Sequence, residues 1–285
     1  MKKLLGVMFL LSTALVAPAI VTPAASAQTG SIEFVARVTP TDGLEEPVRG
    51  FPIFLLSRSY EVICKDASTS VPAPDMDAFI DKLDVSPDLK AWMKKNHWVT
   101  LSGEDFIHKL KVPDVMNVPE FFNAYKARNA GDEASNFPDP KFKASDEKKH
   151  PEKYKLQVDE YTEAIRAFMT QHPDSIDGID GNLTEVDPSP KWTEIEGKYK
   201  SAVRQRGLNL ARSTYLVAKV QTDLQGQGSL RGVPPGTYWL SSLDMTAEVG
   251  DARPRWDVPV TVQAGKTQFI SLSNANALPP AFLSP

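Results

Sequence analysis

Carboxylate side chains gather in one short stretch of the sequence, residues 174–187. Asp177, Asp180 and Glu185 lie there beside Gly178 and Gly181. Calcium is bound by several hard oxygens on a flexible turn, so this composition predicts a candidate calcium site. The EF-hand loop places its ligands at every second position, whereas these carboxylates are mostly three residues apart. A solvated acidic loop is therefore the alternative, and beyond this candidate calcium the sequence predicts no cofactor.

Tryptophans in the middle of the chain form a second group of candidate residues. Trp92, Trp98 and Trp192 lie in a region that is rich in other aromatic side chains. Such rings often line a groove that binds a glycan or a peptide, so the three are candidate ligand-binding residues. Aromatic residues at helical spacing more often form a hydrophobic core, and that is the alternative interpretation.

Catalytic motifs of the common kinds do not occur in the sequence. The four histidines are His97, His108, His150 and His172, and none begins an HExxH or HxxE pattern. The chain also has no G-x-S-x-G elbow and no Walker loop. We therefore predict that the protein is not an enzyme, although the many carboxylates leave acid–base pairs open.

The N-terminus has the three zones of a secretory signal peptide. Lys2 and Lys3 precede a mainly apolar segment, residues 4–16, and Ala25-Ser26-Ala27 follows as a small-residue cleavage site. An uncleaved membrane anchor would need roughly 20 apolar residues, and prolines at 18 and 23 interrupt the run. We predict cleavage after Ala27 and a secreted or periplasmic protein with no transmembrane segment after cleavage.

The net charge argues against nucleic acid as a partner, and the cysteine content excludes an internal disulfide bond. The net charge is −4, so the basic footprint expected of a nucleic-acid-binding protein is missing. Cys64 is the single cysteine, and an internal disulfide is therefore impossible. Stability must come from packing.

Strand-like sequence occurs in two separate pieces, residues 28–64 and 213–285. The first piece alternates apolar and polar residues from Ile32 to Val38 and continues extended through residues 57–64, where Tyr60, Val62 and Ile63 favour strand. The second piece contains several short strands separated by turns, with Pro259 indicating an edge position or a bulge. Within them, residues 28–64 and 213–275 together hold about 100 residues, the usual size of a seven-stranded sandwich.

The sequence between these pieces, residues 65–212, favours helices instead. Proline-started or amphipathic patterns predict helices over 75–83, 87–96, 103–111, 119–129, 152–171 and 191–210, with Ser102 as a cap. The polar run 130–151 predicts a long exposed loop. The fold class is therefore predicted to be α+β, an antiparallel β-sandwich of about seven strands interrupted by a mainly helical insertion.

Three motifs in the strand pieces match a known pattern. They are Pro47-Val48-Arg49-Gly50, Thr222-Asp223-Leu224-Gln225-Gly226 and Val233-Pro234-Pro235-Gly236-Thr237-Tyr238. In order and spacing, these pieces resemble the carboxypeptidase regulatory-like domains, a family of transthyretin-like sandwiches. The resemblance covers the strand pieces only and implies a structural or binding role without catalytic residues.

These observations leave three functions to compare. The leading hypothesis is an exported non-catalytic scaffold or binding module, whose helical insertion presents a surface to a protein or glycan of the cell envelope. The alternative is a protein that binds a small molecule or glycan between the sandwich and the helices. The third is an enzyme with its site in the insertion.

Overall fold

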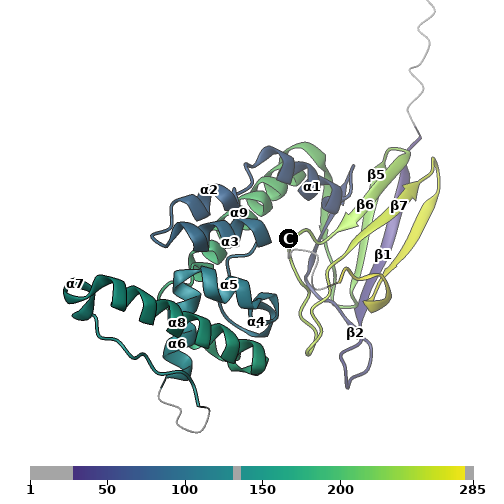
Figure 1. Ribbon diagram of the computed structural model, residues 1–285. Coiled ribbons are helices and arrows are strands. Elements are labelled where there is room, and N and C mark those ends of the chain that lie inside the picture. The colour runs from purple at the N-terminus through teal and green to yellow at the C-terminus, as the bar shows by residue number, and fades with distance from the viewer. Residues whose placement is uncertain (1–27, 131–135, 280–285) are drawn as a thin grey trace, which may run out of the picture. The chain divides into compact units, whose positions relative to one another are not determined.

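The protein is an α+β chain with a strand-rich unit and a helical unit. The computed structural model describes residues 28–130 and 136–279 (Figure 1). Contacts between Cα atoms separate a strand unit, residues 28–57 with 217–279, from a helical unit, residues 58–216. Each unit has its own buried hydrophobic cluster. Along the sequence, the helical unit lies between the two segments that form the strand unit. The predicted signal peptide, residues 1–27, lies outside the described residues.

Eight strands are assigned within the described residues. They are β1 (Gly30–Val38), β2 (Glu46–Pro47), β3 (Pro52–Leu56), β4 (Leu216–Gln221), β5 (Gln227–Val233), β6 (Gly236–Ser241), β7 (Asp257–Val262) and β8 (Thr267–Leu272).

Two four-stranded sheets contain these strands. In the first sheet, β1 pairs antiparallel with β5 and β2 and parallel with β8. The second sheet has the order β4-β3-β6-β7, with antiparallel β3–β6 and β6–β7 pairs. The predicted sandwich is confirmed, and the parallel β1–β8 pair departs from its otherwise antiparallel pattern. Pro259 lies in β7 at the end of the second sheet, as its missing N–H predicts.

The sandwich core follows from the period-two pattern of β1. Ile32, Phe34, Ala36 and Val38 are buried, while the residues between them are half-buried or exposed. The opposing sheet contributes buried aliphatic side chains. Trp256, just before β7, adds its buried ring, and its indole Nε1 donates to the Ser273 carbonyl at 3.0 Å.

Nine α-helices are assigned within the described residues, all in the helical unit. They are α1 (Tyr60–Ser70), α2 (Met76–Asp81), α3 (Pro87–Asn96), α4 (Glu104–Lys109), α5 (Val112–Asn117), α6 (Pro119–Asn129), α7 (Asp146–Lys149), α8 (Pro151–Gln171) and α9 (Ser189–Leu210).

The helices predicted over 87–96 and 119–129 are confirmed to the residue, and the others shift at their ends. Ser86 caps α3 by accepting a hydrogen bond from Leu89 N at 3.1 Å. Ser102, predicted as a cap, instead donates to Asp187 Oδ2 at 3.1 Å, and Gly103 is the N-cap of α4. A short π-helix, Ala211–Tyr215, continues α9 toward β4.

The strand predicted over residues 57–64 is wrong, because helix α1 begins at Tyr60. The hydroxyl of Ser59 accepts a hydrogen bond from Val62 N at 3.4 Å and caps the first turn. Tyr60, Ile63 and Ala67 are buried, which is a helical spacing. Tertiary packing on this stripe therefore outweighs the strand preference of the β-branched residues.

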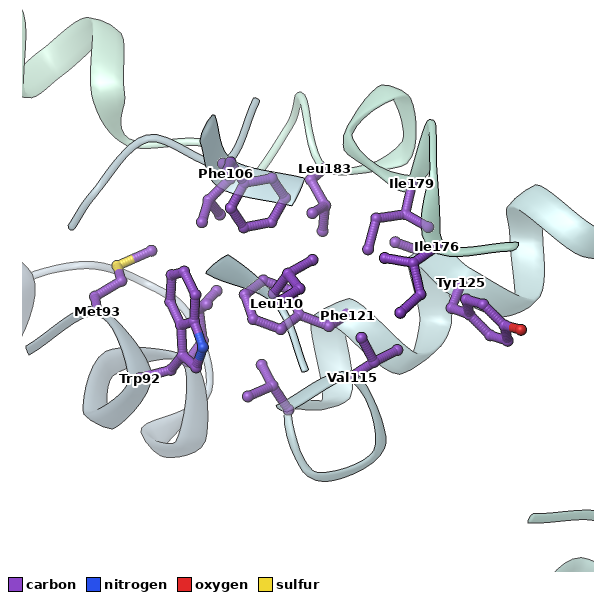
Figure 2. Close-up of a cluster of buried hydrophobic side chains, with 14 of the residues drawn as sticks. Trp92, Met93, Phe106, Leu110, Val115, Phe121, Tyr125, Ile176, Ile179 and Leu183 are labelled. Carbon is purple, nitrogen blue, oxygen red and sulfur yellow. The ribbon is translucent and has the colours of Figure 1, made fainter. Parts of the chain in front are cut away.

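An aromatic cluster organises the core of the helical unit (Figure 2). Trp92 meets Phe121 edge-to-face at a centroid distance of 5.0 Å and Phe106 at 5.8 Å. Aliphatic side chains from α4 to α6 and from the segment after α8 surround these rings. Figure 2 shows Leu110 and Val115 close to them.

Candidate functional site

An open groove of about 780 Å³ lies in the strand unit. It is lined by residues 33–35 of β1, 220–221 of β4, 269–271 of β8, part of β5 and Asp223. This volume falls within the roughly 300–1,000 Å³ that is typical of small-molecule sites.

The strand register places three exposed side chains of the groove in one row. Glu33 on β1 is opposite Ser229 on β5 and opposite Phe269 on β8. Opposite residues of paired strands point to the same face of a sheet, and all three residues are exposed. The row Ser229–Glu33–Phe269 therefore crosses the solvent face of the first sheet.

Phe269 is the unusual member of this row because it is 75% exposed. Its neighbours along β8, Ile270 and Leu272, are half-buried and buried. An aromatic ring on the solvent face adds nothing to the core and presents an apolar surface to solvent. Phe269 is thus an available platform for a ligand ring.

Hydrogen-bonding side chains line the rest of the groove. Gln227 and Arg231 extend from exposed positions of β5, and Gln221 ends β4. Asp223 shapes the turn before β5, since its Oδ1 accepts hydrogen bonds from the backbone amides of Gln225 at 2.9 Å and Gln227 at 2.7 Å. The groove thus contains donors and acceptors as well as one exposed aromatic ring.

Gly228 on β5 lies directly against the ring of Phe34. Phe34 lies opposite Gly228 in the β1–β5 register, and both residues line the groove. A Cβ at position 228 would lie 2.7 Å from Cε1 and 3.0 Å from Cε2 of Phe34, and closer still to Cζ. The ring of Phe34 therefore fills the space that any side chain at this position would need.

The tryptophans predicted to bind ligand belong mainly to the helical core. Trp92 is 4% exposed and Trp192 is 8% exposed, and both are members of the buried cluster. Trp98 is half-buried against this cluster, donates from Nε1 to the Thr100 carbonyl at 2.6 Å, and has Lys109 Nζ 4.3 Å from its ring centroid. The structure thus corrects the ligand-binding interpretation to core packing for Trp92 and Trp192.

The candidate calcium residues are not brought together as one ligand set. Within residues 28–130 and 136–279, no group of three or more His, Cys, Asp or Glu side chains is placed to hold a metal. Asp180 Oδ2 accepts a hydrogen bond from Gly103 N at 3.0 Å at the start of α4. Asp177 and Glu185 therefore gain no coordination shell with Asp180, and this acidic segment instead helps to hold α4.

Phe269 and Glu33 were not among the candidates from the sequence. A signal for Phe269 was present, because Thr267, Phe269 and Ser271 alternate with Gln268, Ile270 and Leu272. That pattern puts a phenylalanine on the polar side of a strand. Glu33 carries no comparable signal, since a polar residue is expected at its position.

In the described part of the chain, no helix is both long and apolar enough to cross a membrane. The partner-binding surface expected on the helical insertion stays a prediction.

Comparisons with known proteins add little to this description. No family model and no curated protein matches the chain, so the resemblance to carboxypeptidase regulatory-like domains stays a prediction. One matching solved structure is described as a "putative carbohydrate binding protein" from Pseudomonas aeruginosa, with 12% identity, 87% of this chain and 90% of that chain covered, and a TM-score of 0.26. Another is a pilus backbone protein from Streptococcus pneumoniae, with 15% identity, 86% and 41% coverage, and a TM-score of 0.23. At these scores neither likeness carries an argument about fold or function.

Proposed function

We propose that this protein is an exported, non-catalytic binding module that holds a glycan in the groove of its β-sandwich. The observation that carries the proposal is the exposed ring of Phe269 within a row of hydrogen-bonding side chains. This proposal keeps the glycan hypothesis from the sequence and assigns the ligand to the strand unit.

The chemistry of a sugar ring fits this arrangement. A pyranose has apolar C–H faces and a rim of hydroxyl groups that both donate and accept hydrogen bonds. The ring of Phe269 can cover the apolar face of one sugar while Glu33 offers an acceptor to its rim, and Ser229 and Gln227 on β5 offer partners to a neighbouring sugar. Binding sites generally combine such an apolar surface with a few polar groups that orient the ligand.

An open groove suits an internal segment of a chain as well as a single sugar. The residues from Gln227 to Arg231 span about 14 Å along β5, at roughly 3.4 Å per residue. That length accommodates more than one ring of a polysaccharide, which is consistent with a module that attaches to an envelope glycan.

Phe269→Ala tests the proposal directly. Fully burying a phenylalanine is worth about 1.5–3 kcal/mol, so covering one face should contribute about half of that. We expect the variant to bind roughly four- to twelvefold more weakly to whichever soluble polysaccharide retards the wild type in affinity electrophoresis. The ring is exposed, so the fold should be retained, and circular dichroism checks this.

Leu224→Ala provides the matched control. Leu224 is 72% exposed in the same unit but does not line the groove. Equal loss of binding in both variants would count against the groove. Absence of binding by the wild type to every glycan of a broad array would overturn the proposed function.

A further inference from the structure

Glu33 is the charged group nearest the aromatic platform of the groove. It is exposed on β1 and directly opposite Phe269 on β8. Within residues 28–130 and 136–279, it takes part in no ion pair at 4.0 Å or less and no side-chain hydrogen bond. Its negative charge is therefore directed to solvent beside the ring.

Two other charged side chains line the groove, Asp223 and Arg231. Asp223 adds a second negative charge, so the three together have a net charge of −1. Arg231 is the cation that could offset Glu33, and its position decides how strongly it does so.

The register places Arg231 far from the platform. Arg231 pairs with Ser31, two residues from the Glu33 row, and β1 separates its strand from β8. With about 4.8 Å between strands and 3.4 Å per residue, its Cβ lies about 12 Å from that of Phe269. Glu33 is only about 5 Å from Phe269 by the same geometry. Since charges are screened over about 8–10 Å in physiological salt, Glu33 dominates the field at the ring.

We infer that Glu33 makes the groove select uncharged sugar rings over acidic ones, an inference that rests on the proposed glycan-binding function. Since adjacent strands are about 4.8 Å apart, a carboxylate or sulfate on a ring stacked against Phe269 would lie about 6 Å from the Glu33 carboxylate. Repulsion between two unit charges at that distance, with an effective dielectric of about 40–80, weakens binding roughly three- to tenfold. Glu33 is thus a specificity-determining residue as well as a hydrogen-bond acceptor.

The test compares neutral and acidic polysaccharides on wild type and Glu33→Gln. The probes are dextran, mannan and xyloglucan against polygalacturonate, alginate and heparin, with affinities measured by retardation in affinity electrophoresis. We expect the wild type to bind a neutral probe, and Glu33→Gln to raise the acidic-to-neutral affinity ratio roughly three- to tenfold. In 1 M salt this difference between wild type and variant should shrink, because the Debye length falls to about 3 Å.

Glu248→Gln is the control, because Glu248 is exposed in the same unit, lies outside the groove and changes the net charge equally. An unchanged ratio in Glu33→Gln, or an equal change in Glu248→Gln, overturns the role of Glu33 and leaves glycan binding standing. Tighter binding of the acidic probes by the wild type also overturns it. If the wild type binds none of the six probes and no glycan of a broad array, both the inference and the proposed function are overturned.

Discussion

Gly228→Ala is expected to destabilise the strand unit, although alanine is the better strand residue. The added methyl group would lie 2.7 Å from Cε1 and 3.0 Å from Cε2 of Phe34. Phe34 is only 4% exposed and belongs to the sandwich core, so its ring cannot move outward freely. Either the ring leaves its rotamer or β5 separates from β1.

Two opposing terms set the size of the effect. Overpacking of a filled core costs about 1–3 kcal/mol. Replacing glycine by alanine in a strand contributes about 0.5–1 kcal/mol in the opposite direction. We therefore expect the free energy of unfolding to fall by about 0.5–2 kcal/mol. In a cooperative unit of 60–100 residues, each kcal/mol shifts the Tm by roughly 4–8 °C.

Urea denaturation of the full mature chain, followed by far-UV circular dichroism and tryptophan fluorescence, measures this change. Phe34→Leu removes part of the ring, so Gly228→Ala should be neutral or stabilising in that background. Gly197→Ala is the control, because Gly197 lies in α9 with open space where an alanine Cβ would be, and it should stabilise by about 1 kcal/mol. The reasoning is refuted if Gly228→Ala is as stable as the wild type, or equally destabilising in both backgrounds.

Two further predictions concern the helical unit. Gly207→Ala would put a Cβ 2.9 Å from Cys64 Sγ, where α1 and α9 pack closely, and should therefore lower the Tm. Adding Cys64→Ala removes the sulfur and should restore the Tm. If the double variant has the same low Tm, this contact is not the cause of the loss. Burial raises the pKa of Tyr125 above its ordinary 10.0, although its hydrogen bond to Ser175 acts in the opposite direction. The folded state therefore holds this proton more tightly than the unfolded state, so stability contributed by Tyr125 is present below pH 10.0 and is lost as the pH rises through the folded-state pKa. Tyr125→Phe should make the alkaline decrease in urea midpoint shallower, and an identical decrease in both proteins would contradict this.

Local signals explain why part of the fold was predictable. The alternation from Ile32 to Val38 needs only one buried face, and the structure buries these residues as predicted. Helix α3 was predicted to the residue because Ser86 and Pro87 mark its start through capping and the fixed φ of proline. In both cases the deciding interactions lie within a few residues of each other.

Helix α1 shows where local reasoning fails. Tyr60, Val62 and Ile63 favour strand individually, and the preceding strand β3 ends only at Leu56. The cap at Ser59 and the buried stripe through Ala67 reverse that preference. The cap residue was visible in the sequence, but the surface that buries the stripe was not.

The candidate site is formed by the pairing of strands that are far apart in the sequence, so no single segment predicts it. Phe269 and Glu33 lie near opposite ends of the chain and meet only because β8 pairs parallel with β1 in one register. A slip of one residue would turn Phe269 toward the core and place Gln268 or Ile270 beside Glu33 on the solvent face. The three tryptophans were predicted to bind ligand because they are large aromatic residues, yet Trp92 and Trp192 are buried in the helical core. In this sandwich, the ring on the polar side of β8 is the sequence signal for the candidate site, and strand pairing determines which charge accompanies it.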